Sequence, residues 1–95
     1  MAGYALIDAE ITDHAAFAEF RERAPAVLEA HGGRYLVRGG ATKVVQGDWT
    51  PHRVVLLEFE SVERAQAWWD SPDHAELRAM LDKCSNTTVT IVEGV

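Results

Sequence analysis

The segment 53–60 is the feature that most constrains the fold of this 95-residue chain. Its centre, Val-Val-Leu-Leu at positions 54–57, is apolar at every position, whereas a strand with one face in water alternates apolar and polar residues. A strand that is apolar throughout is typical of a position buried on both faces. The run is far shorter than the roughly 20 apolar residues that a bilayer-spanning helix needs. It therefore predicts a central strand of a sheet and no membrane-spanning segment.

Around this segment the sequence predicts the order strand, helix, strand, strand, helix, strand. A helix is expected after Thr12-Asp13, because apolar residues recur every three or four positions from Phe17 to His31. Pro25 is expected to bend or split this helix, since proline removes an amide donor. Ser61 is expected to begin a second helix, and Pro72 a new helical start after it. The expected strands are residues 4–11, 34–38, 42–46, 53–60 and 87–93, with 34–38 and 42–46 as a possible hairpin around Gly39-Gly40.

Right-handed crossovers turn this order into an α+β fold, the ferredoxin-like plait (βαββαβ). It has a four-stranded antiparallel sheet with the helices on one face, and the first and third strands lie at its centre. Helices cover only one face, so the apolar positions 4–7 and 54–57 would leave a water-exposed apolar surface on the other. We therefore expect residues 1–95 to form a single domain and a homodimer through the open sheet face.

Charge and cysteine content narrow the partners and the location. The formal net charge is −6, which argues against nucleic acid and anionic membranes because both select clustered positive charge. An RNA-recognition motif shares the strand and helix order but needs exposed aromatic residues on its central strands. Cys84 is the single cysteine, so no intrachain disulfide can form. The first residues resemble the start of a strand and not a signal peptide, and we expect a cytoplasmic protein.

Four stretches appear in an order that is specific in combination: Gly-Arg-Tyr-Leu-Val-Arg-Gly-Gly at 33–40, Gly-Asp-Trp at 47–49, Leu-Glu-Phe-Glu-Ser at 57–61 and Ala-Trp-Trp-Asp-Ser-Pro-Asp at 67–73. With the closing residues 91–94 they resemble the domain-of-unknown-function 1330 family, within the dimeric α+β barrel superfamily. The resemblance covers roughly residues 3–94. It implies a small cytoplasmic homodimer with a pocket between sheet and helices. It implies no particular reaction, because the superfamily includes cofactor-free monooxygenases, haem-degrading enzymes, muconolactone-isomerase-like proteins and stress-response barrels.

The chain departs from the family pattern at several positions. Glu60, Gln46 and Trp69 stand where Pro, Glu and Tyr are frequent. On the last helix, His74 replaces a usual Tyr and Leu81 a usual Arg. Positions 74 and 81 are seven residues apart and therefore share a helical face. If they line a pocket, its ligand differs from that of the relatives.

Arg38 and Glu58 are the first candidates for function, because each is a charged residue among apolar strand positions. We expect them to pair across the sheet. In a functional interpretation, Arg38 holds a carboxylate or enolate oxygen and Glu58 acts as general base. In a structural interpretation, the pair orients Gly39-Gly40 or the dimer contact. The sequence leaves both open.

The other ligand-binding candidates are Asp8, Trp49, Arg53 and His74. Asp8 either faces the pocket or lies solvated at a strand end. Trp49 and Arg53 belong to a loop that can form the rim of a site, where Trp49 either stacks on a ligand or anchors the loop. His74 is either a satisfied core histidine or a catalytic proton shuttle. The four histidines lie in different elements without metal-ligand spacing, so we expect no metal and no cofactor.

Two functions remain open from the sequence. One is a pocket for a small organic acid or carbonyl metabolite, with or without cofactor-independent catalysis. The alternative is a non-catalytic dimeric interaction or structural module, in which the same charges only fix the interface. The sequence does not decide whether the protein is an enzyme.

Overall fold

The computed structural model describes residues 1–95 and contains four strands and three helices. These are β1 (Gly3–Ile11), α1 (His14–Ala30), β2 (Arg34–Arg38), β3 (Val54–Phe59), α2 (Val62–Asp70), α3 (Pro72–Cys84) and β4 (Ser85–Glu93). The strands form one antiparallel sheet in the order β2-β3-β1-β4. The expected ferredoxin-like plait, with β1 and β3 at its centre, is confirmed. None of the helices is both long and apolar enough to cross a membrane.

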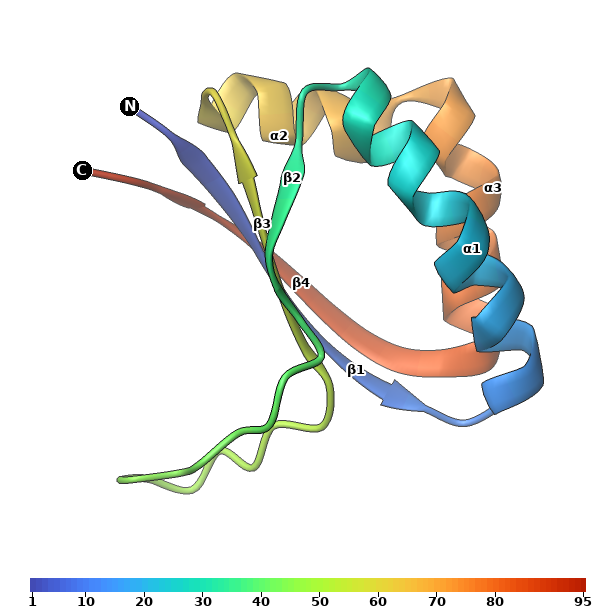
Figure 1. Cartoon of the computed structure of the whole chain (residues 1–95), viewed down its shortest axis with the longest axis vertical. Coiled ribbons are helices and arrows are strands. Elements are labelled where there is room, and N and C mark those ends of the chain that lie inside the picture. Colours follow the sequence, from blue (N-terminus) through green and yellow to red (C-terminus); the bar gives the residue numbers. More distant parts are fainter.

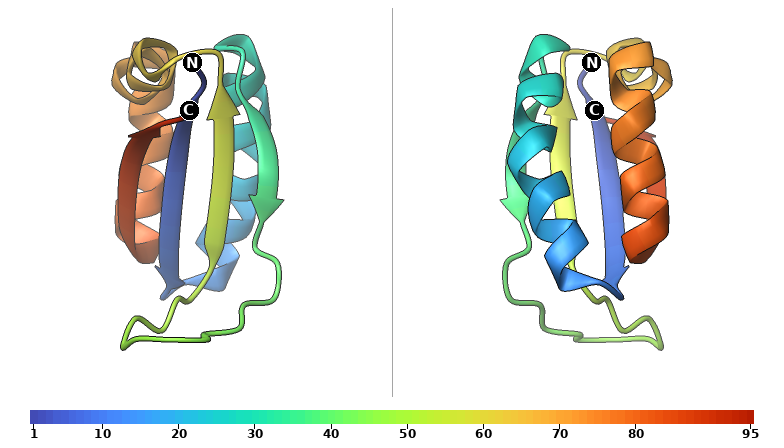
Figure 2. Two further views of the ribbon diagram at one scale, coloured as in Figure 1. Left: turned by 90° about the vertical axis from the view of Figure 1, so that its left-hand side faces the viewer. Right: turned by 90° about the vertical axis from the view of Figure 1, so that its right-hand side faces the viewer.

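The molecule has two layers, with all helices on one face of the sheet (Figure 1). Helix α1 lies behind β2 and β3, and α3 lies behind β1 and β4 (Figure 2). The opposite face of the sheet carries no helix. The long connection between β2 and β3 projects beyond the end of the sheet, away from the helices (Figure 1).

Two side chains begin the helices as the sequence predicts. The Asp13 carboxylate accepts a hydrogen bond from the Ala16 amide at 3.1 Å, and the Ser61 hydroxyl accepts one from the Arg64 amide at 3.1 Å. Each bond satisfies an amide that has no partner inside its helix. Of the two effects expected of Pro25, a bend or a split, the split does not occur, because α1 is a single element from His14 to Ala30.

The core lies between the sheet and the helices. Phe59, Leu77 and Cys84 are among its most deeply buried side chains. Trp68 packs against Phe59 with ring centroids 5.3 Å apart. Burial raises the pKa of the Cys84 thiol, which makes this cysteine a small core residue and a poor nucleophile.

The open face of the sheet is apolar at its centre. In the register, Leu6 of β1 pairs with Leu56 of β3, and Leu56 pairs with Val37 of β2. These residues alternate with the core-facing Ala5 and Leu57, so no helix covers them. The sequence expectation of an uncovered apolar sheet surface therefore agrees with the structure.

The strand expected over residues 42–46 is wrong, because this stretch belongs to the connection between β2 and β3 and forms no strand. Val44 and Val45 are both exposed, Val45 to 87%. Both sides of β3 are already paired, by β2 and β1, so this segment has no free neighbour there. The β-preference of valine produces a strand only where a partner strand is available.

Candidate functional site

A cavity of about 60 Å³ lies between the sheet and the three helices, and 11 of its 15 lining residues are hydrophobic. The other four are Arg21, Arg38, Arg53 and His74. No acidic residue lines it. The structure therefore combines an apolar chamber with three guanidinium groups and one imidazole.

Arg38 reaches this cavity because β2 contains a register shift. Arg34 pairs with Glu58, but the shift between Tyr35 and Val37 places Arg38 opposite Val55, which faces the helices. An extra residue in one strand moves every later side chain to the other face. The expected ion pair between Arg38 and Glu58 is therefore wrong, because the two side chains lie on opposite faces of the sheet.

The guanidinium of Arg38 is held by two contacts. It lies 4.5 Å from the centroid of the Tyr35 ring, and its Nη2 donates a hydrogen bond to the main-chain carbonyl of Arg21 at 3.1 Å. In a regular helix that carbonyl would accept from the amide of residue 25. Residue 25 is proline and has no amide hydrogen, so the carbonyl is free to accept from Arg38.

Arg53, the residue just before β3, also lines the cavity. Its guanidinium lies 5.2 Å from the centroid of the Phe17 ring and packs against Gly39, where a Cβ atom would overlap it. Its Nε is buried and has no hydrogen-bond partner. Burial lowers the pKa of Arg53, and the positive charges of Arg21 and Arg38 lower it further.

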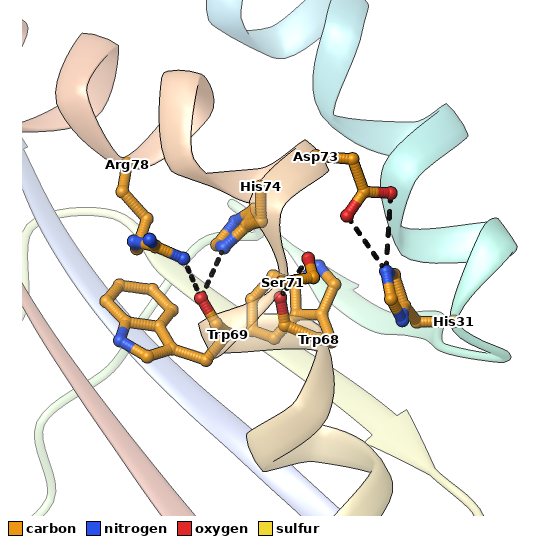
Figure 3. A network of polar contacts seen from close by, with 7 residues as sticks. All are labelled: His31, Trp68, Trp69, Ser71, Asp73, His74 and Arg78. Carbon is orange, nitrogen blue, oxygen red and sulfur yellow. Dashed lines mark hydrogen bonds and ion pairs between the residues drawn. The ribbon is translucent and has the colours of Figure 1, made fainter.

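His74 is 4% exposed and stacks on Trp68 with ring centroids 4.4 Å apart. Figure 3 shows its imidazole and the Arg78 guanidinium converging on the main-chain carbonyl of Trp69, at 3.2 Å from Nδ1 of His74. Because a carbonyl only accepts, Nδ1 carries the proton and Nε2 keeps its lone pair. Burial lowers the pKa of His74, and the nearby Arg78 adds to the effect.

Glu58 lies on the open face, outside the cavity. It accepts hydrogen bonds from Arg34 Nε at 2.7 Å and from the Tyr4 hydroxyl at 3.1 Å. These two bonds, with that of Arg34 the stronger influence, lower the pKa of the carboxyl. Glu58 therefore belongs to a charged cluster on the open sheet face and does not contact the residues around Arg38.

Asp8 and Trp49 also lie outside the cavity. The Asp8 carboxylate accepts from the Trp49 indole at 3.1 Å and from the His52 amide at 2.9 Å. Burial would raise the pKa of Asp8, but these hydrogen bonds outweigh it and the pKa is lowered. The contacts fasten the connection between β2 and β3 to β1, so the loop-anchoring interpretation of Trp49 fits the structure.

The cavity thus brings together Arg38, Arg53 and His74 and leaves Asp8, Trp49 and Glu58 on the other side of the sheet. The sequence analysis missed Arg21, although it lies four residues after Phe17 and hence on the same face of α1. It also missed Tyr35, whose alternation with the exposed Arg34 indicates the buried side of β2. The sequence analysis did not predict the register shift in β2, and this shift decides which residues of β2 reach the cavity.

Comparison with known proteins supports the fold. A protein of unknown function from Rhodopseudomonas palustris superposes with a TM-score of 0.75 at 15% identity, over 99% of this chain and 82% of that one. A dimeric ferredoxin-like protein of unknown function from Jannaschia sp. gives 0.67 at 18% identity, over 99% and 100%. Another from Thermobifida fusca gives 0.56 at 11% identity, over 99% and 92%.

A family model described as "Domain of unknown function (DUF1330)" matches residues 2–95. A comparison with curated proteins finds no match.

Proposed function

Since the chain belongs to the domain-of-unknown-function 1330 family, which carries no reaction with it, we propose a function from the cavity itself. The protein is a homodimer whose cavity binds a small organic acid or carbonyl metabolite. One observation carries this proposal: three arginines and a histidine line an otherwise apolar chamber that contains no acidic residue. Arg53 Nε is buried without a hydrogen-bond partner, and buried polar groups normally have one. A chamber of this composition therefore favours a ligand with electron-rich oxygen atoms.

The size of the cavity restricts the ligand further. Its volume of about 60 Å³ holds a few water molecules, whereas sites for drug-sized ligands usually measure about 300–1,000 Å³. His74 and Leu81 both line the cavity. Since they replace the family's usual Tyr and Arg, this chamber has an imidazole and an isobutyl group in place of a phenol and a guanidinium. A short-chain ligand of a few non-hydrogen atoms fits these limits.

His74 is the candidate for catalysis within this proposal. With its proton fixed on Nδ1, the neutral imidazole presents Nε2 as a base. A base beside several guanidinium groups suits the removal of a proton next to a carboxylate or carbonyl, because the arginines stabilise the negative charge that develops on oxygen. Glu58, the second catalytic candidate from the sequence, has no role in this step because it lies on the other face of the sheet.

The homodimer is supported by the open sheet face. Leu6, Val54 and Leu56 form its apolar centre, and no helix covers them. Soluble monomers rarely leave a large apolar patch in water. The Jannaschia and Thermobifida relatives are dimeric ferredoxin-like proteins. A cytoplasmic location remains the prediction from the sequence.

The alternative, a non-catalytic dimeric interaction module, is supported by a different cluster. Glu58, Tyr4 and Arg34 form a charged network on the open face, which would fix the register of two packed sheets. In this alternative the cavity is a packing defect with no ligand of its own.

A thermal-shift screen with short-chain carboxylates and with small neutral carbonyl compounds separates the two functions. A ligand at a hundred times its Kd stabilises a folded protein by about 2.7 kcal/mol. For a domain of this size the Tm then rises by roughly 10–20 °C. Arg38→Ala should abolish the shift, and Glu58→Gln, on the opposite face, should retain it. If no compound raises the Tm of the wild type, the cavity is not a binding site and the interaction module is favoured.

A further inference from the structure

Three guanidinium groups from different parts of the fold meet at one cavity. Arg21 comes from α1, Arg38 from the end of β2, and Arg53 from the residue before β3. No ion pair of the protein includes any of the three. By contrast, Arg23, Arg34 and Arg64 each pair with a glutamate on the surface. Arg78 also has no ion pair, but its guanidinium donates to the main-chain carbonyl of Trp69. Three of the four arginines without a carboxylate partner therefore line the cavity.

The fold positions these cations at a cost in stability. Burial lowers the pKa of Arg53, and the positive charges of Arg21 and Arg38 lower it further. A buried donor without a partner destabilises the folded protein, and more so when it is charged. Arg53 Nε is the one buried side-chain nitrogen or oxygen atom of the protein that lacks a partner.

Two special backbone positions keep the arrangement in place. Gly39 has φ 71°, and the absence of a side chain there makes room for the Arg53 guanidinium. Pro25 leaves free the Arg21 carbonyl that accepts from Arg38. These features hold the guanidinium groups of Arg38 and Arg53 at the apolar chamber.

We infer that Arg21, Arg38 and Arg53 form a carboxylate subsite, and that the ligand is a small monocarboxylate whose apolar body extends towards Trp68 and His74. The inference rests on the proposed function, that this cavity binds a small molecule, and restricts it to anions. The carboxylate accepts from Arg53 Nε and from the guanidinium groups of Arg38 and Arg21, because a planar carboxylate matches the fork of a guanidinium. Arg21 is thereby assigned as a binding residue.

The apolar lining favours a carboxylate over inorganic phosphate. Phosphate has no apolar part to fill a chamber in which 11 of 15 residues are hydrophobic. Phosphate would contact only the arginine end of the cavity. Inorganic phosphate is therefore the appropriate competitor in the test.

The test is isothermal titration of the full-length wild-type protein with matched acid and amide pairs, propionate against propionamide and butyrate against butyramide. We expect a carboxylate to bind at least roughly tenfold more tightly than its isosteric amide, because hydrogen bonds to charged groups are the stronger ones. Binding should weaken as the salt concentration increases. Inorganic phosphate should compete only weakly.

Variants separate a binding role from a structural one. Arg53→Met should abolish carboxylate binding and, by removing an unsatisfied buried donor, raise the Tm of the free protein. Arg21→Gln should weaken carboxylate binding at least several-fold. Arg64→Gln, on the outer face of α2, is the control and should bind as the wild type does. Gly39→Ala should weaken binding by displacing Arg53, whereas Gly40→Ala, with open space around it, should not.

The outcomes distinguish this inference from the proposed function. If the amides bind as tightly as the acids, the cavity is a binding site but the carboxylate subsite is wrong. If phosphate binds as tightly as the best carboxylate, the assignment to a monocarboxylate is wrong. If no acid or amide binds, both proposals fail. A fall in Tm for Arg53→Met together with unchanged binding would show that Arg53 is a structural residue.

Discussion

At the scale of single residues, Pro25 affects a side chain of another element because proline has no amide hydrogen. It lies inside α1 without ending the helix, and it leaves the carbonyl of Arg21 without an amide donor. Arg38, 17 residues away from Arg21 in the sequence, donates to that carbonyl instead. A residue usually considered a helix breaker here helps to position a side chain at the cavity.

His74 makes the stability of the protein depend on pH in a defined range. Its pKa in the folded protein lies below the value of about 6.5 in an unfolded chain, because burial disfavours the charged imidazolium. Arg78 and His31 also lower this pKa, whereas the hydrogen bond to the Trp69 carbonyl and the charge of Asp73 raise it. As the pH falls, the unfolded chain therefore binds this proton first. The stability gained from neutral His74 is complete above about pH 6.5 and is lost as the pH falls from there through the folded-state pKa.

We therefore expect the free energy of unfolding of the wild type to decrease between pH 7 and pH 5.5, and that of His74→Asn to decrease less. Asparagine keeps a donor for the Trp69 carbonyl but has no proton to bind in this range. Urea unfolding at several pH values measures the effect. His14→Asn, at an exposed histidine, is the control. Parallel pH curves for His74→Asn and the wild type would contradict the prediction.

At the scale of elements, one register shift decides which side of the sheet carries which charge. It moves Arg38 to the helix face, while Arg34 stays opposite Glu58 on the open face. Sequence parity places residues 34 and 38 on the same side, and a strand without the shift would do so. The two charged sites of the protein are therefore separated by a local feature of β2 that alternation of residue types does not reveal.

The contact between β1 and the start of α2 is so close that adding one methyl group tests it. Gly3 of β1 lies against the backbone of Ser61 and Val62, where an added Cβ would come within 2.5 Å of Ser61 O and of Val62 N. Backbone atoms at the start of a helix cannot move aside easily. We expect Gly3→Ala to destabilise the protein by about 1–3 kcal/mol.

Gly40→Ala is the matched control, because nothing lies within 4 Å of a Cβ at that position. It should leave the free energy of unfolding nearly unchanged or raise it by up to about 1 kcal/mol. Both variants are compared by urea unfolding. Equal stability of Gly3→Ala and the wild type would show that β1 and α2 are less tightly packed than the structure indicates.

At the scale of the whole molecule, the helices cover one face of the sheet and the apolar centre of the other remains open. A short acidic chain has few ways to cover such a surface. Pairing two open faces removes both apolar surfaces from water at once, and it places the charged network of Glu58, Tyr4 and Arg34 inside the contact region.

We expect sedimentation equilibrium to give a mass of twice 10.5 kDa at micromolar concentration. Leu56→Lys should give the monomer mass with the helical content retained, because a lysine in the centre of the open face opposes association but is tolerated in water. Ala79→Lys, at an exposed position of α3, should remain dimeric. A mass near 10.5 kDa for the wild type would contradict the homodimer.

The sequence by itself determined the order of the elements, the ferredoxin-like topology, the central position of β3 and the uncovered apolar face. These follow from alternation, helical periodicity and capping residues, which act over a few neighbouring positions. Only the tertiary structure decided that residues 42–46 form no strand and that α1 continues through Pro25. It also decided that Arg38 faces Arg21 and Arg53 and not Glu58. These depend on strand partners and on a register shift, and such contacts join residues too distant in the chain for a local pattern to record them.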